Sequence, residues 1–217
     1  MSETKIPDQK AVWNRKHGDG DHESFHARPS TLAEIVEPKL MHYTKILELG
    51  CGVGRDAAFF ARNGHDVTAT DFSDVVIERN KKMLGDLGIR FQVVDMQQPL
   101  PYEDESFDMV FANLSLHYYT DEDTRKIISD IARVLRPNGL LAFVCKSVND
   151  FHYGNGEEVE ENLFVGKSGH VRHLFSEDYA RDLIEGAFDI ELLEEVTEVY
   201  SDDTSVMIRC LAEKTSE

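Results

Sequence analysis

One short stretch of the chain begins with an acid and then alternates glycine with other residues. The residues of this stretch that could bind a ligand are Glu48, Gly50, Cys51, Gly52 and Gly54. The apolar run 46–49 leads into it, so we expect the glycines to follow a buried strand and open a helix. Glycine allows a tight turn and lets a ligand approach the backbone closely. A dinucleotide fingerprint is excluded because Arg55 stands where its third glycine belongs. A tight turn without a ligand is the alternative to a binding site for another small molecule.

A second acid, Asp71, ends the next apolar run, 67–70. Nucleotide-binding α/β folds place a ribose-binding acid about 20 residues beyond the glycines, and Asp71 stands near that position. A carboxylate there can accept hydrogen bonds from both ribose hydroxyls, and we assign its neighbour Phe72 to the same site. The alternative is that Asp71 only caps the helix that begins near Ser73.

The loops after the third and fourth predicted strands carry further side chains that could bind a ligand. Asp95 and Met96 follow the run 89–94, and Asn113 follows the run 107–112. Ligands of open α/β sheets lie at the carboxyl ends of the strands. We therefore expect Asp95, Met96 and Asn113 to face the same ligand as the glycine turn, with an ordinary loop role for Asp95 as the alternative.

Candidate catalytic residues lie in two later loops, one after the fourth strand and one in the segment 146–172. They are His117, Tyr118, His170 and Arg172. A guanidinium can fix an oxyanion or carboxylate by a forked contact, and a histidine can accept a proton near neutral pH. The alternative is that Arg172 pairs with a surface acid such as Glu177 and that the histidines are merely exposed.

The elements that must position these residues alternate between strand and helix. Apolar runs predict strands at 46–49, 67–70, 89–94, 107–112, 140–144, 190–199 and 205–212, with a turn at 136–139. Helical spacing and capping residues predict helices at 30–40, 55–63, 73–87, 120–135 and 176–185. Repeated β–α units imply a doubly wound α/β fold. We expect a mostly parallel seven-stranded sheet with helices on both faces and a C-terminal antiparallel hairpin.

The glycine stretch resembles the E-x-G-x-G-x-G motif of class I S-adenosylmethionine-dependent methyltransferases. The segment from Arg133 to Gly139 resembles that family's R-x-L-K-P-G-G segment. The resemblance implies that S-adenosylmethionine is the cofactor. It also implies that Asp95 accepts a hydrogen bond from the adenine amino group and that the backbone N–H of Met96 donates to the adenine ring.

The flanking regions are loosely similar to the tellurite-resistance and thiopurine branch of small-molecule methyltransferases, on the Trp13 arm and the segment 169–173. We expect residues 1–29 to form an N-terminal arm or lid and residues 30–217 to form the methyltransferase domain. Within that domain, the insertion 146–172 is expected to be part of the acceptor pocket. An arm that stays mobile is the alternative to a lid. The arm residues that could cover the cofactor are Trp13, Phe25 and Arg28.

The composition excludes several classes of partner. A formal net charge of −18 argues against nucleic acid, because binding to phosphates depends on lysine and arginine. The sequence has no apolar segment of membrane-spanning length and no signal-peptide core, so we expect a cytoplasmic protein without a membrane partner. The spacings of His22 with His26 and of His170 with His173 permit a metal, but no nearby cysteine completes a set, so none is expected. The oligomeric state stays open.

These observations predict methyl transfer from S-adenosylmethionine to a small-molecule acceptor through an oxygen, sulfur or nitrogen nucleophile. A protein or RNA methyltransferase is the alternative within the enzymes. The acidic composition of the chain argues against an RNA substrate. The segment 113–116 also lacks the Asn-Pro-Pro-Tyr type of tetrapeptide, which is typical of enzymes that methylate the amino groups of adenine or glutamine. The third possibility is a non-catalytic protein that binds the cofactor and regulates a partner.

Overall fold

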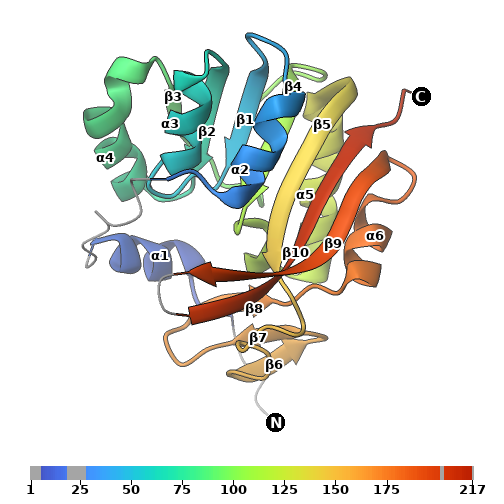
Figure 1. Cartoon of the computed structure of the whole chain (residues 1–217). Helices are drawn as coiled ribbons and strands as arrows, with labels where there is room; N and C mark the ends of the chain where they lie inside the picture. Colours follow the sequence, from blue (N-terminus) through green and yellow to red (C-terminus); the bar gives the residue numbers. More distant parts are fainter. Residues whose placement is uncertain (1–5, 19–27, 201–202, 217) are drawn as a thin grey trace.

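The computed structural model of the chain describes residues 6–18, 28–200 and 203–216. Its main sheet has seven strands in the order β3-β2-β1-β4-β5-β10-β9, which confirms the predicted sheet (Figure 1). The first five strands of the order are parallel, and β10 pairs antiparallel with β5 and β9 as the predicted hairpin. The strands are β1 (Lys45–Leu49), β2 (Asp66–Asp71), β3 (Arg90–Val93), β4 (Phe107–Asn113), β5 (Leu135–Lys146), β9 (Phe188–Tyr200) and β10 (Asp203–Lys214).

Helices cover both faces of this sheet (Figure 1). One face packs against α2 (Thr31–Val36), α3 (Arg55–Arg62) and α4 (Asp74–Leu84). The other face packs against α5 (Asp121–Val134) and α6 (Glu177–Ile184). Side chains of a strand alternate between the two faces of the sheet. Ile46 of β1 thus packs with the helices of the first face, and its neighbour Leu47 packs with α5 and α6 on the other. Short 3-10 turns complete the list: η2 (Glu37–Lys39), η3 (Gly85–Leu87) and η4 (Leu116–Tyr118).

The predicted turn at 136–139 is wrong, because β5 begins directly after α5, at Leu135. Leu135 is fully buried and pairs with Phe107 of β4, so the strand is held by core contacts from its first residue. The residues that predicted a turn form a bulge instead, where the register between β4 and β5 shifts. Asn138 supplies the left-handed backbone there, with φ of 60°.

Two further segments lie beyond the carboxyl ends of the parallel strands (Figure 1). The arm contains α1 (Gln9–Gly18). The insertion folds into a second sheet of β6 (Glu157–Glu160), β7 (Leu163–Val165) and β8 (Val171–His173). Its strands have only three or four residues each, which is too short for a clear period of two in the sequence.

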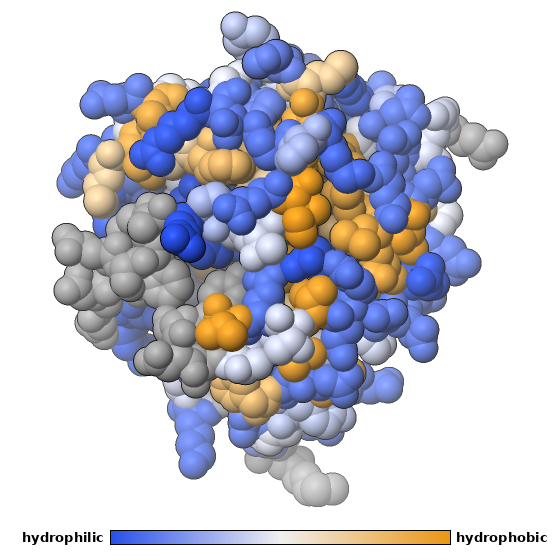
Figure 2. Space-filling view, in the orientation of Figure 1, coloured by the Kyte–Doolittle hydropathy of each residue, from blue (hydrophilic) through white to orange (hydrophobic). Residues whose placement is uncertain are grey.

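The face of the molecule seen in Figure 2 is mostly hydrophilic, with small apolar areas scattered over it. This agrees with a composition of 41 acidic and 23 basic residues. Among the described helices, none has the length and apolar character needed to cross a membrane.

Candidate active site

A cavity of about 310 Å³ lies at the carboxyl ends of β1, β2 and β4. Ligands of doubly wound sheets bind at this edge. Most residues predicted to hold the cofactor line it: Glu48, Gly50, Cys51, Gly52, Asp71, Phe72, Met96 and Asn113. Gly54 and Asp95 do not line it.

The glycine turn is shaped by close packing on one side and by open space on the other. At Gly50 a Cβ atom would lie 2.4 Å from Cβ of Ser115, so only glycine fits against the loop after β4. At Gly52 a Cβ atom would meet nothing within 4 Å. At Gly54 it would lie 2.9 Å from Cδ1 of Leu84, so Gly54 serves the packing of α3 on α4. The cavity wall is therefore bare backbone at Gly52.

Asp71 joins the glycine turn to the start of α4. Its two carboxylate oxygens accept hydrogen bonds from the backbone N–H of Gly52, at 3.0 Å, and of Ser73, at 2.9 Å. Burial raises the pKa of Asp71, and these backbone donors oppose the shift. The N-cap of α4 is Ser73, whose hydroxyl accepts from Val76 N. Asp71 is therefore not the helix cap, and its carboxylate faces the cavity.

An acidic corner lies where β1 meets α3. Glu48 is buried, and its Oε2 has no hydrogen-bond partner among the described residues. Asp56 is also buried and accepts from the backbone N–H of Ser30, at 2.6 Å, and from Nδ2 of Asn113, at 3.4 Å. Burial, followed by the charge of Asp56, raises the pKa of Glu48 well above its usual value. Arg55, whose Nε lies 3.8 Å from Oδ2 of Asp56, supplies one positive charge here. The two carboxyl groups therefore leave Oε2 of Glu48 for a cationic group on a ligand.

The opposite end of the cavity is apolar. Phe72, Met96 and Tyr119 line it, and burial raises the pKa of the Tyr119 phenol. Asp95 is exposed, and its Oδ1 accepts from the backbone N–H of Gln97 at 3.0 Å within its own turn. The predicted contact of Asp95 with adenine thus has no support from the cavity lining, whereas Met96 lies in that lining.

The loop after β4 places Tyr118 in the cavity wall and buries His117, which does not line the cavity, beside it. His117 beside it is 1% exposed, and neither of its ring nitrogens has a hydrogen-bond partner among the described residues. Burial lowers the pKa of His117 well below its usual value, and the charges of Lys146 and Arg172 lower it further. His117 is therefore neutral, with a free lone pair on its ring.

Helix α1 closes the cavity on the side of the second sheet. Gln9, Trp13 and Lys16 line it. The Trp13 ring packs edge-on against Tyr118, with centroids 4.8 Å apart, and against His170, at 5.0 Å. Gln9 also accepts from the backbone N–H of Val171 at 3.1 Å. Of the other predicted arm residues, Arg28 is exposed and outside the cavity lining, and Phe25 lies outside the described residues.

His170 packs against Trp13, and neither His170 nor Arg172 lines the cavity itself. Burial, then the charges of Lys16 and Arg172, lowers the pKa of His170 to about 4. Arg172 is half-buried and forms no ion pair with any residue that the structure describes. The alternative pairing of Arg172 with Glu177 is wrong, since Glu177 accepts from the backbone N–H of Glu195 instead.

The chain matches known proteins over this site. Residues 47–143 match a family model described as a methyltransferase domain. A solved structure from Methanosarcina mazei described as a SAM-dependent methyltransferase superposes with a TM-score of 0.75, at 24% identity, over 84% of this chain and 98% of the other. Over residues 47–143 the chain is thus similar to a methyltransferase domain, and its fold is that of S-adenosylmethionine-dependent methyltransferases.

Named relatives of the chain include phosphoethanolamine N-methyltransferase 1 of Triticum aestivum, 33% identical over 170 residues, which are 76% of this chain and 33% of the wheat protein. The chain thus spans about a third of the length of that curated relative. A Burkholderia thailandensis 1,6-didemethyltoxoflavin-N1-methyltransferase structure superposes over 95% of this chain and 87% of the other, with a TM-score of 0.75 at 20% identity. None of these three is described as a tellurite-resistance or thiopurine enzyme, so the finer resemblance gains no support from them.

Sequence reasoning missed several residues of the lining, among them Arg55, Asp56, Gln9 and Lys16. Asp56 had one available signal, because it follows the glycine turn by two positions and so begins the helix at the cavity. Gln9 and Lys16 had none, because the apolar residues of α1, Ala11 to Trp13, are consecutive and form no stripe along the helix.

Proposed function

We propose that this chain methylates a small molecule that carries an anionic group, and that S-adenosylmethionine is the methyl donor. The residues of the cavity fit that cofactor. The free Oε2 of Glu48 and the neighbouring Asp56 suit its ammonium group, and Asp71 suits its ribose hydroxyls. The bare backbone at Gly52 lets it approach closely, and the apolar end with Met96 suits a purine ring.

The proposal of an anionic acceptor rests above all on Arg172. This guanidinium is half-buried and lacks an ion pair among the described residues, in a chain with 41 acidic residues against 23 basic ones. Its charge acts on His117, Tyr118 and His170, so it lies near the acceptor end of the site. A guanidinium left without a carboxylate there favours an anion supplied by the substrate.

The names of two relatives agree with such an acceptor. The wheat relative is named for phosphoethanolamine. A protein of Actinopolyspora halophila, 32% identical over 111 residues, is named for glycine, sarcosine and dimethylglycine, although the match covers 49% of this chain and 19% of that protein. Each of these acceptors is a small amine that carries a phosphate or a carboxylate. We therefore infer that the nucleophile is an amine nitrogen.

Three groups of the chain then have defined tasks. When bound, S-adenosylmethionine supplies an activated methyl group, because its sulfonium sulfur leaves as a neutral thioether. Arg172 and Lys16 hold the anion of the acceptor, and Tyr118 and Trp13 exclude water from the path between the two subsites. Neutral His117 accepts the proton that the amine must lose.

A panel of acceptors tests this function. We expect cofactor-dependent methylation of phosphoethanolamine, glycine or sarcosine, and at least tenfold lower kcat/KM for ethanolamine, which lacks the anion. Equal rates with charged and neutral amines would remove Arg172 from the site. Tight cofactor binding without turnover of any acceptor in the panel would favour the non-catalytic regulator instead.

A further inference from the structure

Strand β8 carries Arg172 next to the cavity, and one edge of β8 has no strand partner. β8 packs against η4, whose residue Tyr118 lines the cavity. The second sheet has the order β6-β7-β8, so β8 pairs with β7 on one side only. Val171, which precedes Arg172, is 1% exposed, and a buried backbone N–H needs a hydrogen-bond partner. The place of Arg172 therefore depends on what covers the free edge of β8.

The side chain of Gln9, in the first turn of α1, covers this edge. Its Oε1 accepts from the backbone N–H of Val171 at 3.1 Å, and its Nε2 donates to the carbonyl oxygen of Gly169 at 2.9 Å. These two groups, on either side of His170, are ones that a further strand would pair with. The carboxamide of Gln9 thus takes the place of a peptide group of a neighbouring strand.

A carboxamide is the side-chain group that suits all the backbone partners of Gln9. Its Nε2 donates a second hydrogen bond, to the carbonyl oxygen of Pro7 at 3.0 Å. One oxygen therefore accepts from an N–H while one nitrogen donates to two carbonyl oxygens. A carboxylate of the same size could accept from Val171, but its second oxygen would face the carbonyl oxygens of Pro7 and Gly169.

The same helix makes two further contacts with the segment 169–171. Trp13 lies one turn after Gln9, and its ring packs edge-on against His170, with centroids 5.0 Å apart. At Gly169 a Cβ atom would lie 3.3 Å from Cγ2 of Val12, so glycine lets the helix approach this segment closely. Each of the three residues before Arg172 is therefore in contact with α1.

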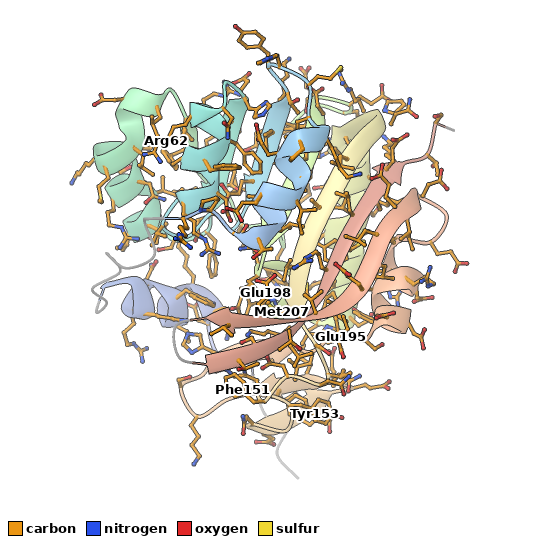
Figure 3. All side chains as sticks on the ribbon, in the orientation of Figure 1. Arg62, Phe151, Tyr153, Glu195, Glu198 and Met207 are labelled. Carbon is orange, nitrogen blue, oxygen red and sulfur yellow. The ribbon has the colours of Figure 1, made fainter. Side chains whose placement is uncertain are left out.

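The other side of β8 is held by elements other than α1. Arg172 pairs with Phe164 of β7, and the Phe164 ring packs against Tyr153, with centroids 5.3 Å apart. Tyr153 and its neighbour Phe151 lie beside the second sheet, next to the β9–β10 hairpin (Figure 3). We therefore expect a change at Gln9 to loosen the free edge of β8 and to leave the second sheet folded.

We propose that Gln9 is a positioning residue for the acceptor, because its carboxamide holds the edge of β8 and thereby places Arg172. This inference rests on the proposed function, since it takes Arg172 as the group that binds the anion of the acceptor. Gln9 lines the cavity, but its amide hydrogens and its oxygen are already bonded to backbone groups. Its effect on the acceptor therefore passes through Arg172.

The first test is Gln9→Ala, with Lys10→Ala, exposed on the same turn of α1, as the control. We expect Gln9→Ala to raise KM for phosphoethanolamine about fivefold, as for the loss of ordinary hydrogen bonds. Its kcat, cofactor affinity and melting temperature should stay those of the wild type, and Lys10→Ala should change nothing. Gln9→Glu should raise KM at least as much. Wild-type KM in Gln9→Ala, or an equal loss of cofactor affinity, would overturn the proposal.

A double variant separates the positioning of Arg172 from a general cover over the site. In the Arg172→Gln background, Gln9→Ala should lower kcat/KM by less than about twofold, because the group that Gln9 positions is no longer there. Independent effects would add, so the full loss seen in the single variant would reappear. That result would overturn the proposal even if Gln9→Ala alone had raised KM.

Two readouts do not depend on turnover. Trp13 is the single tryptophan of the chain, so its fluorescence reports how α1 packs against His170. In Gln9→Ala we expect emission at longer wavelength and stronger quenching by iodide. Hydrogen exchange at the Val171 amide should accelerate at least about tenfold. Unchanged fluorescence and exchange would overturn the proposal even if no acceptor in the panel were methylated, whereas absence of methylation by the wild type alone would count against the proposed function.

Discussion

Asp71 accepts a hydrogen bond from the backbone N–H of Gly52 at 3.0 Å, and this contact ties the end of β2 to the glycine turn after β1. The same carboxylate accepts from the backbone N–H of Ser73 at the start of α4. One acid thus fixes two loops of the cavity and still faces its interior. The glycine turn and the acid that would bind the ribose are therefore held together by a direct hydrogen bond.

Replacing Asp71 by asparagine should weaken S-adenosylmethionine binding by about 1.5–3 kcal/mol, because a charged hydrogen-bond acceptor is lost while the size of the side chain is kept. Calorimetry with S-adenosylhomocysteine measures the change. Asp86→Asn, an exposed position in η3, is the matched control and should bind normally. Unchanged affinity in Asp71→Asn would exclude Asp71 from the binding site.

Gly54→Ala should destabilise the fold rather than the site. Gly54 has φ of 77°, and its new Cβ would lie 2.9 Å from Leu84. The left-handed backbone alone costs an alanine about 1–2 kcal/mol, and the contact with Leu84 adds to it. Gly88 has φ of 73°, and a Cβ atom there would meet nothing within 4 Å. Gly88→Ala therefore measures the loss of stability from the left-handed backbone alone. Chemical unfolding should show a larger loss for Gly54→Ala, and equal losses would contradict the packing role.

His117 should make stability fall with acidification. Its pKa in the folded state is lowered, so the unfolded chain binds a proton below about pH 6.5 while the folded chain does not. The contribution of neutral His117 to the free energy of unfolding is therefore complete above that pH. It is lost as the pH falls from there toward the lower pKa of His117 in the folded protein. His117→Leu should flatten the curve by up to about 1.4 kcal/mol per pH unit in urea unfolding between pH 7 and 5. Parallel curves would show that His117 is not held neutral.

Trp13→Ala should loosen the cover that α1 forms over the site. The ring contacts Tyr118 and His170, and such aromatic pairs contribute about 0.5–1.5 kcal/mol each. We expect KM for the acceptor to rise several-fold while the melting temperature changes little. Lys10→Ala, exposed on the same helix, should leave KM unchanged. If Trp13→Ala keeps the wild-type KM, α1 is not a lid for the acceptor.

The part of the site that lies within short stretches of sequence was predictable. Glu48, Gly50 and Gly52 lie at the end of one strand, and Asp71 ends the next, so the carboxyl-edge rule places them together. Asp56 could not be predicted in the same way, since its partners Ser30 and Asn113 come from distant segments. Its burial is a consequence of the tertiary fold.

The remaining differences also have physical causes. The turn signals at 136–139 were overridden because Leu135 is buried against β4 and holds the strand in the sheet. Helix α1 has little intrinsic tendency to be found, because it is short and polar. It is held by contacts made only in the folded protein, such as that of Gln9 with Val171.

The central claim is that Arg172 binds the anion of a small amine acceptor, and steady-state kinetics of Arg172→Gln test it most directly. With phosphoethanolamine or the best anionic acceptor, kcat/KM should fall about 10- to 100-fold, as expected for loss of a charged hydrogen bond of about 1.5–3 kcal/mol. Cofactor affinity should stay constant, and Lys167→Gln, exposed on the same segment, should behave as the wild type. The selectivity for anionic over neutral amines should disappear. Wild-type kcat/KM and undiminished selectivity in Arg172→Gln would contradict the claim.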